Sequence, residues 1–145
     1  MIQLLQMPMS ISINASLANN PREGARGRIK TKAYLDYIKA VEHWRLANLA
    51  AVNTARSEVR RQVGLGKVLH VSYLFVFDRG KIITQSGRPK RLDTSNRIKV
   101  LDDQLSALLL IDDSYFWSGH FTKMSKLFDD KEDYVDVTIT FREKE

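Results

Sequence analysis

The sequence predicts a single mixed α/β (α+β) domain over residues 1–145, with a mixed four-stranded sheet and two main helices in the order β-α-β-α-β-β. Three observations predict it. Lys32–Val63 has a helical hydrophobic period and contains no Gly or Pro. Val68–Phe77 is rich in β-branched and aromatic residues, which favour a buried central strand. Tyr134–Arg142 alternates polar and apolar residues, which is typical of a strand with one buried face.

The segments between these three supply the remaining elements. The alternation in Ser10–Asn14 predicts a first strand, Pro21 and nearby glycines predict a loop, and Gly64 and Gly66 end the long helix. The further expected elements, in chain order, are a strand over about Met9–Ala15, a loop over Leu17–Gly27, a basic loop over Asp78–Arg91, a helix over Thr94–Leu110, a strand over Ser114–Lys123 and an acidic turn over Asp129–Asp133.

The composition narrows the class of protein. The chain has no cysteine, so disulfides and thiolate metal sites are excluded and a reducing, cytoplasmic location is expected. The segment Met1–Ser10 lacks the basic start and long apolar run of a signal peptide. No apolar run approaches the roughly 20 residues that a membrane span needs, so no membrane partner is expected.

The net charge of +6 is unevenly distributed. Met1–Lys99 contains 18 Lys and Arg against 6 Asp and Glu, whereas Val100–Glu145 contains 5 against 11. A basic body favours a polyanionic partner, because neutralising phosphates releases counterions. Solubility alone is the alternative explanation, and nucleic acid is the preferred one.

The predicted second helix has two distinct faces. Ile98, Leu101, Leu105 and Leu108 form one stripe, which should pack on the sheet. The opposite stripe is polar and comprises Asn96, Lys99, Asp103 and Ser106. An ordinary solvated helix has the same pattern. Lys99 and Asp103 are four positions apart, which is the spacing of a common surface ion pair on a helix.

Carboxylates flank this helix at both ends. Asp93 precedes it and the pair Asp112–Asp113 follows it, and clustered carboxylates hold hard divalent metals. The helix is about 25 Å long if fully formed, so its two ends cannot meet directly. They converge only if the strand Ser114–Lys123 runs back antiparallel and the loop before Asp93 lies across its start.

These residues resemble those of the RusA-type Holliday junction resolvases, endodeoxyribonucleases common in phages and prophages. The resemblance lies in Asp93-Thr94-Ser95-Asn96-Arg97-Ile98-Lys99, Asp103 one turn on, and the pair Asp112–Asp113. Asn19–Asn20 and the cationic run Arg88–Arg91 also resemble parts of the family pattern. The resemblance covers nearly the whole chain in element order.

The resemblance implies a homodimer that cleaves four-way DNA junctions with Mg²⁺ or Mn²⁺. It implies that Asp93, Asp113 and Asp112 are catalytic metal ligands, that Asp103 matches a mid-helix carboxylate near the metal, and that Lys99 is the active-site lysine. Ser95 stands where the family usually has a second Asp, and a hydroxyl cannot supply the missing charge. The alternative is therefore a non-catalytic relative that binds branched DNA.

A further set of residues is expected to contact the DNA backbone. They are Arg88, Lys90, Arg91, Arg97, Asn96, Asn20, Arg28, Lys30 and Lys32. Such contacts position DNA without reading its bases, and each residue could equally be a solvated surface charge. His43, His70 and His120 are too scattered in the sequence to predict a zinc site. A third reading is a basic RNA-binding or protein-interaction domain.

Overall fold

The computed structural model describes residues 1–12, 15, 17–19, 28–90, 94–127 and 132–144. Its centre is a four-stranded mixed sheet in the order β1-β6-β4-β5, formed by β1 (Ile2–Pro8), β6 (Tyr134–Arg142), β4 (Val68–Phe77) and β5 (Phe116–Ser125). β6 is antiparallel to both of its neighbours, whereas β4 and β5 are parallel. The predicted mixed α/β class and four-stranded sheet are therefore confirmed.

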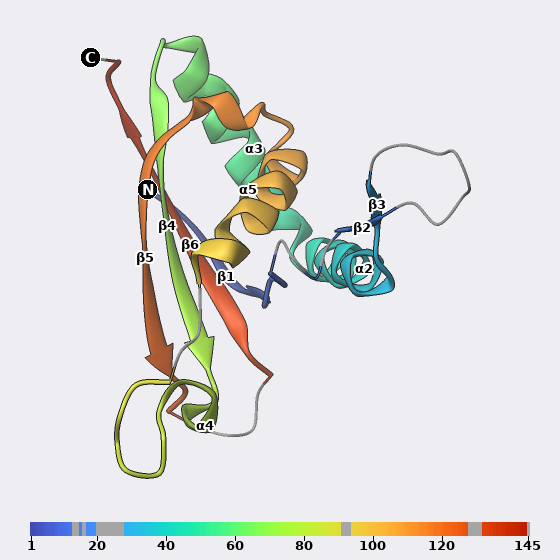
Figure 1. Ribbon diagram of the computed structural model, residues 1–145. Coiled ribbons are helices and arrows are strands. Elements are labelled where there is room, and N and C mark those ends of the chain that lie inside the picture. The colour runs from blue at the N-terminus through green and yellow to red at the C-terminus, as the bar shows by residue number, and fades with distance from the viewer. Residues whose placement is uncertain (13–14, 16, 20–27, 91–93, 128–131, 145) are drawn as a thin grey trace.

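The described helices α2 (Lys32–Ala47), α3 (Leu49–Gly64) and α5 (Ser95–Leu109) lie on one side of this sheet (Figure 1). The prediction of one helix over Lys32–Val63 was wrong, because the chain breaks at Asn48, giving three main helices rather than two. The Asn48 side chain donates a hydrogen bond to the Trp44 carbonyl at 2.8 Å. This local bond competes with the helical ladder, and the hydrophobic period alone does not reveal it.

β4 is an interior strand that contributes five side chains to the core. Leu69, Val71, Tyr73, Phe75 and Phe77 alternate along it and are all buried in the cluster beneath the helices. The strand has the bounds predicted for it. β6 also begins and ends as predicted, and its apolar residues at 135, 137 and 139 are fully buried opposite the β4 core residues.

α5 connects the two parallel strands β4 and β5. Leu101 and Leu105 are fully buried and Leu108 nearly so, as the predicted apolar stripe requires. The observed helix agrees with the expected Thr94–Leu110 to within one residue at each end. β5 turns back from the end of α5, so the strand runs antiparallel to the helix as the sequence argument needed (Figure 1).

The first strand was predicted in the wrong place. β1 covers Ile2–Pro8, whereas Met9–Ser12 has no regular structure and Ala15 is not in a strand, against the expected Met9–Ala15. A register shift lies between Leu4 and Met7, both of which are buried against β6. Gln6, within this shift, has a φ of +55°. The irregularity removes the two-residue alternation by which a strand is recognised from sequence.

The connections also differ from expectation. Leu17–Asn19, expected as loop, forms β2 and pairs antiparallel with β3 (Arg28–Lys30). The basic segment after β4 contains a one-turn helix, α4 (Arg79–Ile82), and a bridge between Ile83 and Pro89. Among the described helices, none has the length and apolarity needed to cross a membrane.

Candidate metal and phosphate site

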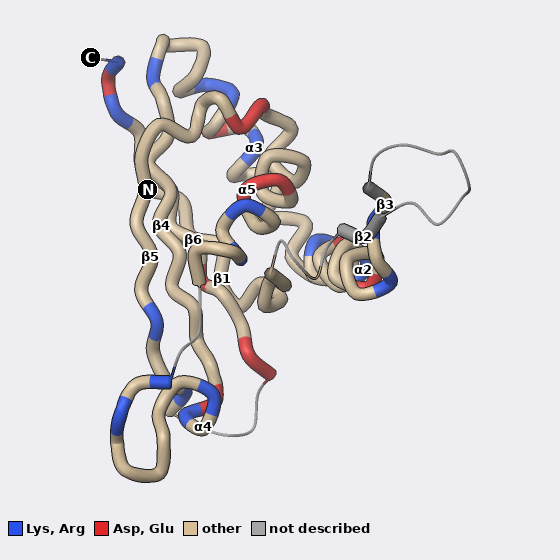
Figure 2. Tube along the Cα trace, in the orientation of Figure 1, with Lys and Arg blue, Asp and Glu red and all other residues tan. Residues whose placement is uncertain are grey.

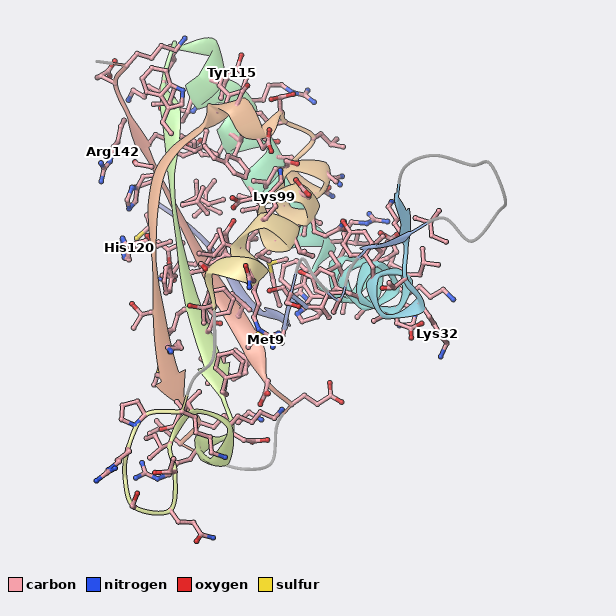
Figure 3. All side chains as sticks on the ribbon, viewed as in Figure 1. Met9, Lys32, Lys99, Tyr115, His120 and Arg142 are labelled. Atoms are coloured by element: carbon pink, nitrogen blue, oxygen red, sulfur yellow. The ribbon has the colours of Figure 1, made fainter. Side chains whose placement is uncertain are left out.

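Lys99 lies one turn into α5, on the polar face of the helix (Figure 3). Its Nζ is 2.9 Å from Asp103 Oδ1 and 3.5 Å from Asp113 Oδ2. The expected i,i+4 pair with Asp103 is therefore present. The second contact joins the helix to a residue beyond its end, so Lys99 is shared between two carboxylates.

Local backbone geometry brings Asp113 back toward Lys99. α5 ends at Leu109, and Leu110 adopts a left-handed conformation with φ of +56°. The chain then enters the short 3₁₀ helix η1 (Asp113–Tyr115), from which β5 continues. This tight return places Asp113 beside α5, whereas Asp93, with which it was expected to converge, lies outside the described residues.

A third carboxylate, Asp102, belongs to the same cluster and was missed by the sequence analysis. Its Oδ1 accepts a hydrogen bond from the buried hydroxyl of Tyr73 on β4. Asp102 is four residues after Ile98 and three before Leu105, so it interrupts the sheet-facing side of the helix. A carboxylate at such a position is the sequence signal that could have identified it.

The electrostatics of the cluster are coupled. Burial raises the pKa of Asp102 above its usual range. The hydrogen bond from Tyr73 and the charge of Lys99 oppose this rise. The negative charges of Asp103 and Asp113 add to it. The hydrogen bond to Asp103 raises the pKa of Lys99, and Asp113 adds to the increase. Two carboxylates contact the one ammonium of Lys99, so the pairings leave an excess of negative charge there, which attracts a cation.

Asp112 and Arg97 have different surroundings from those expected. The Asp112 carboxylate accepts a hydrogen bond from the Ser114 backbone at 2.8 Å and caps η1, which lowers its pKa. Arg97 donates to the Ser10 carbonyl, and its guanidinium lies 5.7 Å from the Phe77 ring centre. Arg97 is thus directed into the fold, and the structure favours a packing role for it over DNA contact.

Several predicted site residues lie outside the described residues, namely Asp93, Arg91 and Asn20. Arg28 is in β3. Lys30 is exposed and lies 5.4 Å from the Tyr34 ring centre, and the exposed Lys32 pairs with Asp36 at 3.7 Å. Asn96 is half-buried in the first turn of α5.

The expected cationic segment follows β4. Arg88 and Lys90 are exposed there, and Lys90 Nζ donates to the Gly80 carbonyl at 2.5 Å. Figure 2 shows further blue segments in the loop around α4, at the carboxyl ends of β4 and β5. At the same ends, the nearly buried Lys126 pairs at 2.9 Å with both Asp78 and Asp133.

The fold also brings together two histidines that are distant in the sequence. His70 Nε2 and His120 Nδ1 are 3.3 Å apart on neighbouring strands, and Ser118 Oγ is 2.8 Å from His70 Nδ1. They lie on the sheet face away from α5, where His120 projects from β5 (Figure 3). His43 lies on α2, so the three histidines do not form one group.

The donor set around Lys99 has the chemistry that Mg²⁺ or Mn²⁺ prefers, since carboxylate oxygens are hard ligands. Within the described part of the chain, no group of three or more His, Cys, Asp or Glu is arranged to hold a metal ion. The ammonium of Lys99 contacts the two carboxylates nearest to it. Among the described residues, the carboxylates in contact with Lys99 are therefore Asp103 and Asp113, whereas Asp93 lies outside them.

Comparison with known proteins adds little to this geometry. No family model matches the sequence, and no curated protein matches it. One solved structure with partial similarity is a 2C-methyl-D-erythritol-2,4-cyclodiphosphate synthase, at 17% identity and a TM-score of 0.32. The match covers 63% of this chain and 53% of that one, so the chain spans about half the length of the structure it matches.

Proposed function

We propose that this protein is a metal-dependent endodeoxyribonuclease that cleaves four-way DNA junctions in recombination or repair, acting in the cytoplasm as a homodimer. The observation that carries the proposal is the contact of Lys99 with Asp113. A lysine and a carboxylate separated by 14 positions in the sequence meet at 3.5 Å, beside Asp102 and Asp103. These are the residue types that hydrolysis of a phosphodiester requires.

Each residue has a definite task in the proposed reaction. A bound Mg²⁺ or Mn²⁺ would supply an activated water and neutralise charge on the phosphate. Asp113 and Asp93 would hold the ion, with Asp103 and Asp112 as further candidates. Lys99 would place its ammonium against the scissile phosphate and stabilise the negative charge that develops there.

The basic loop around α4 suits the DNA on one side of the cut. Arg88 and Lys90 are exposed at the end of β4 and β5, and α5 begins after this loop. Phosphate contacts of this kind position the strand without selecting a sequence. A homodimer would present two such sites related by a two-fold axis, which matches the symmetry of a four-way junction.

A junction cleavage assay tests the proposal. Labelled four-way junctions are incubated with the protein and Mg²⁺ or Mn²⁺, and the products are compared with those from plain duplex of the same arm sequence. We expect paired nicks near the crossover that require the metal. Binding to junctions without nicking, in either metal and across neutral pH, would reject the enzyme and leave a DNA-binding protein.

The second candidate, a non-catalytic protein that binds branched DNA, is favoured by one specific observation. Ser95, at the start of α5, stands where the resembled resolvase family usually has a carboxylate, and Lys99 neutralises part of the negative charge nearby. A weaker metal site follows from both. Both candidates bind branched DNA. They differ in whether the protein cuts the junction when a divalent metal is present. A third candidate, the basic RNA-binding or protein-interaction domain, would bind junctions no more tightly than duplex DNA or RNA.

A further inference from the structure

A hollow of about 360 Å³ lies between α5 and the edge strand β5. The residues that shape it are Ile98, Asp102, Phe116, Trp117, Gly119 and Phe121. Its volume exceeds that of a single planar ring system such as a nucleobase. It adjoins the candidate site, because Asp102 in its wall directly precedes Asp103 on α5, and Asp103 pairs with Lys99 at 2.9 Å.

Two aromatic side chains of β5 line this hollow while remaining open to solvent. Trp117 is 54% exposed and Phe121 is 44% exposed, which is unusual for rings on a strand of a small domain. The Phe121 ring packs edge-on against the buried Phe75 ring at 6.5 Å, which fixes its position. Exposed, positioned rings are the surfaces on which the bases of single-stranded nucleic acid stack.

Gly119 lies midway between these two residues on β5 and lines the same hollow. A Cβ atom on this residue would lie 2.2 Å from the Val71 carbonyl oxygen, so the close approach of β4 excludes a side chain there. The wall of the hollow at this point is therefore backbone.

The inner end of the hollow is polar. The Asp102 carboxylate accepts a hydrogen bond from Tyr73, and a carboxylate has further lone pairs that can accept other donors. A half-buried acceptor beside aromatic walls matches a planar ring with an amino group at its edge. An aliphatic side chain of a protein partner would fill the apolar part and give the Asp102 carboxylate no donor beyond Tyr73.

We propose that the hollow between α5 and β5 receives an unpaired nucleobase of the DNA strand bound at Lys99, stacked against Trp117 and Phe121, with an amino group of the base donating to Asp102. This inference rests on the proposed function for the presence of DNA. It adds a base-binding site that would hold the strand open beside the scissile phosphate.

Tryptophan fluorescence provides a direct test without metal or cleavage. The chain has two tryptophans, so Trp44→Phe leaves Trp117 as the only emitter. This full-length variant is titrated with a four-way junction, a single-stranded oligonucleotide and a blunt duplex. We expect the junction and the single strand to quench Trp117 strongly at saturation, and the duplex to quench it far less. Saturated binding with unchanged Trp117 emission would overturn the proposal.

A pair of variants on the same strand gives the matched control. Phe121→Ala removes one wall, whereas Met124→Ala truncates a side chain that is 37% exposed on the other face of β5. We expect Phe121→Ala to weaken single-strand binding about tenfold to a hundredfold and Met124→Ala to leave it unchanged. Equal effects of the two substitutions would overturn the proposal. Trp117→Ala, at the more exposed ring, serves in place of Phe121→Ala if that variant does not fold.

The contact with Asp102 is tested by changing the DNA instead of the protein. Oligonucleotides containing deoxyadenosine are compared with those containing deoxynebularine, which lacks only the amino group. Weaker binding of the nebularine strand is expected, and equal binding would refute the Asp102 contact. A Trp117 emission that changes with protein concentration before DNA is added would instead identify the hollow as an interface between copies of the chain.

These outcomes distinguish failure of the inference from failure of the proposed function. Quenching by DNA in a protein that never cuts junctions would support the base site and reject the nuclease. Cutting of junctions without quenching of Trp117 would support the nuclease and reject the base site. The absence of any DNA binding would reject both.

Discussion

The ammonium of Lys99 lies 3.5 Å from a carboxylate oxygen of Asp113, across the junction between α5 and the strand that follows it. The same ammonium contacts Asp103 at 2.9 Å, so one lysine spans a helix and its return segment. An exposed ion pair of this kind contributes only about 0–1 kcal/mol to stability. The Lys99–Asp113 contact therefore matters more for chemistry at the site than for the stability of the fold.

Asp113→Asn should abolish junction cutting while sparing junction binding. The amide keeps the shape of the side chain but removes the charge that a divalent ion needs, so we expect the cleavage rate to fall by about 100-fold or more. Cleavage and gel-shift assays on one preparation measure both effects. Glu143→Gln is the control, because Glu143 is an exposed carboxylate whose ion-pair partner, Lys67, lies outside the candidate site. Cutting that survives in Asp113→Asn would refute the ligand assignment.

Lys99→Met should reduce the cleavage rate with little change in stability. Loss of one charge-stabilising group costs about 10²–10³-fold in rate, whereas loss of an exposed ion pair changes the free energy of unfolding by no more than about 1 kcal/mol. Single-turnover cleavage and urea unfolding separate the two effects. Lys39→Met, an exposed lysine on α2, should leave both unchanged. A rate for Lys99→Met equal to that of the Lys39 control would assign Lys99 to an ordinary surface pair.

Ser95→Asp should lower the Mg²⁺ concentration needed for half-maximal cutting. Ser95 begins α5, where an added carboxylate also interacts favourably with the helix dipole. The measurement is the rate of junction cleavage against Mg²⁺ concentration. The exposed Ser57 on α3 provides the control variant Ser57→Asp, which adds the same charge elsewhere. An unchanged dependence of the rate on Mg²⁺ would mean that another group already supplies the ligand. If the wild type does not cut junctions and Ser95→Asp does, the wild type is the non-catalytic DNA-binding protein.

The sequence predicted those parts of the fold and site that depend on strict periodicity. Val68–Phe77 and Tyr134–Arg142 have their predicted bounds because two-residue alternation and β-branching leave little choice there. The polar face of α5, with Lys99 beside Asp103, was predicted from the helical period of the sequence. The contact of Lys99 with Asp113 required the chain to reverse after Leu110, and helical period does not contain that information.

The parts that could not be predicted depend on contacts between distant segments. Leu4 and Met7 are three residues apart, yet both face the core, since a register shift intervenes between them. The Asp102 carboxylate accepts a hydrogen bond from Tyr73, which lies 29 positions earlier in the chain. The register shift leaves no local pattern, and the position of Asp102 on the sheet-facing side of α5 marks this carboxylate without revealing its partner. The expected role of Asp93 remains a prediction, because Asp93 lies outside the described residues.

Substitutions of Tyr73 and of Asp102 should have opposite effects on the free energy of unfolding. Tyr73→Phe removes the donor and leaves a half-buried carboxylate without it, which should cost about 1–3 kcal/mol of unfolding free energy. Asp102→Asn keeps an acceptor for Tyr73 but removes the buried charge, so it should stabilise the protein at neutral pH. Equilibrium urea unfolding measures both variants, and a Tyr73→Phe substitution made in the Asp102→Asn background should cost less than in the wild type.

The pH dependence of the Asp102→Asn effect identifies burial as its cause. Burial raises the pKa of Asp102 in the folded state, so the folded protein holds the proton more tightly than the unfolded chain. The contribution of Asp102 is therefore most favourable below the unfolded pKa of about 4 and is lost as pH rises through the raised folded value. Asp102→Asn should match the wild type most closely in acid and exceed it in unfolding free energy near neutral pH. A difference that grows as the pH falls would show that hydrogen bonding to the ionised carboxylate, rather than its desolvation, dominates at this position.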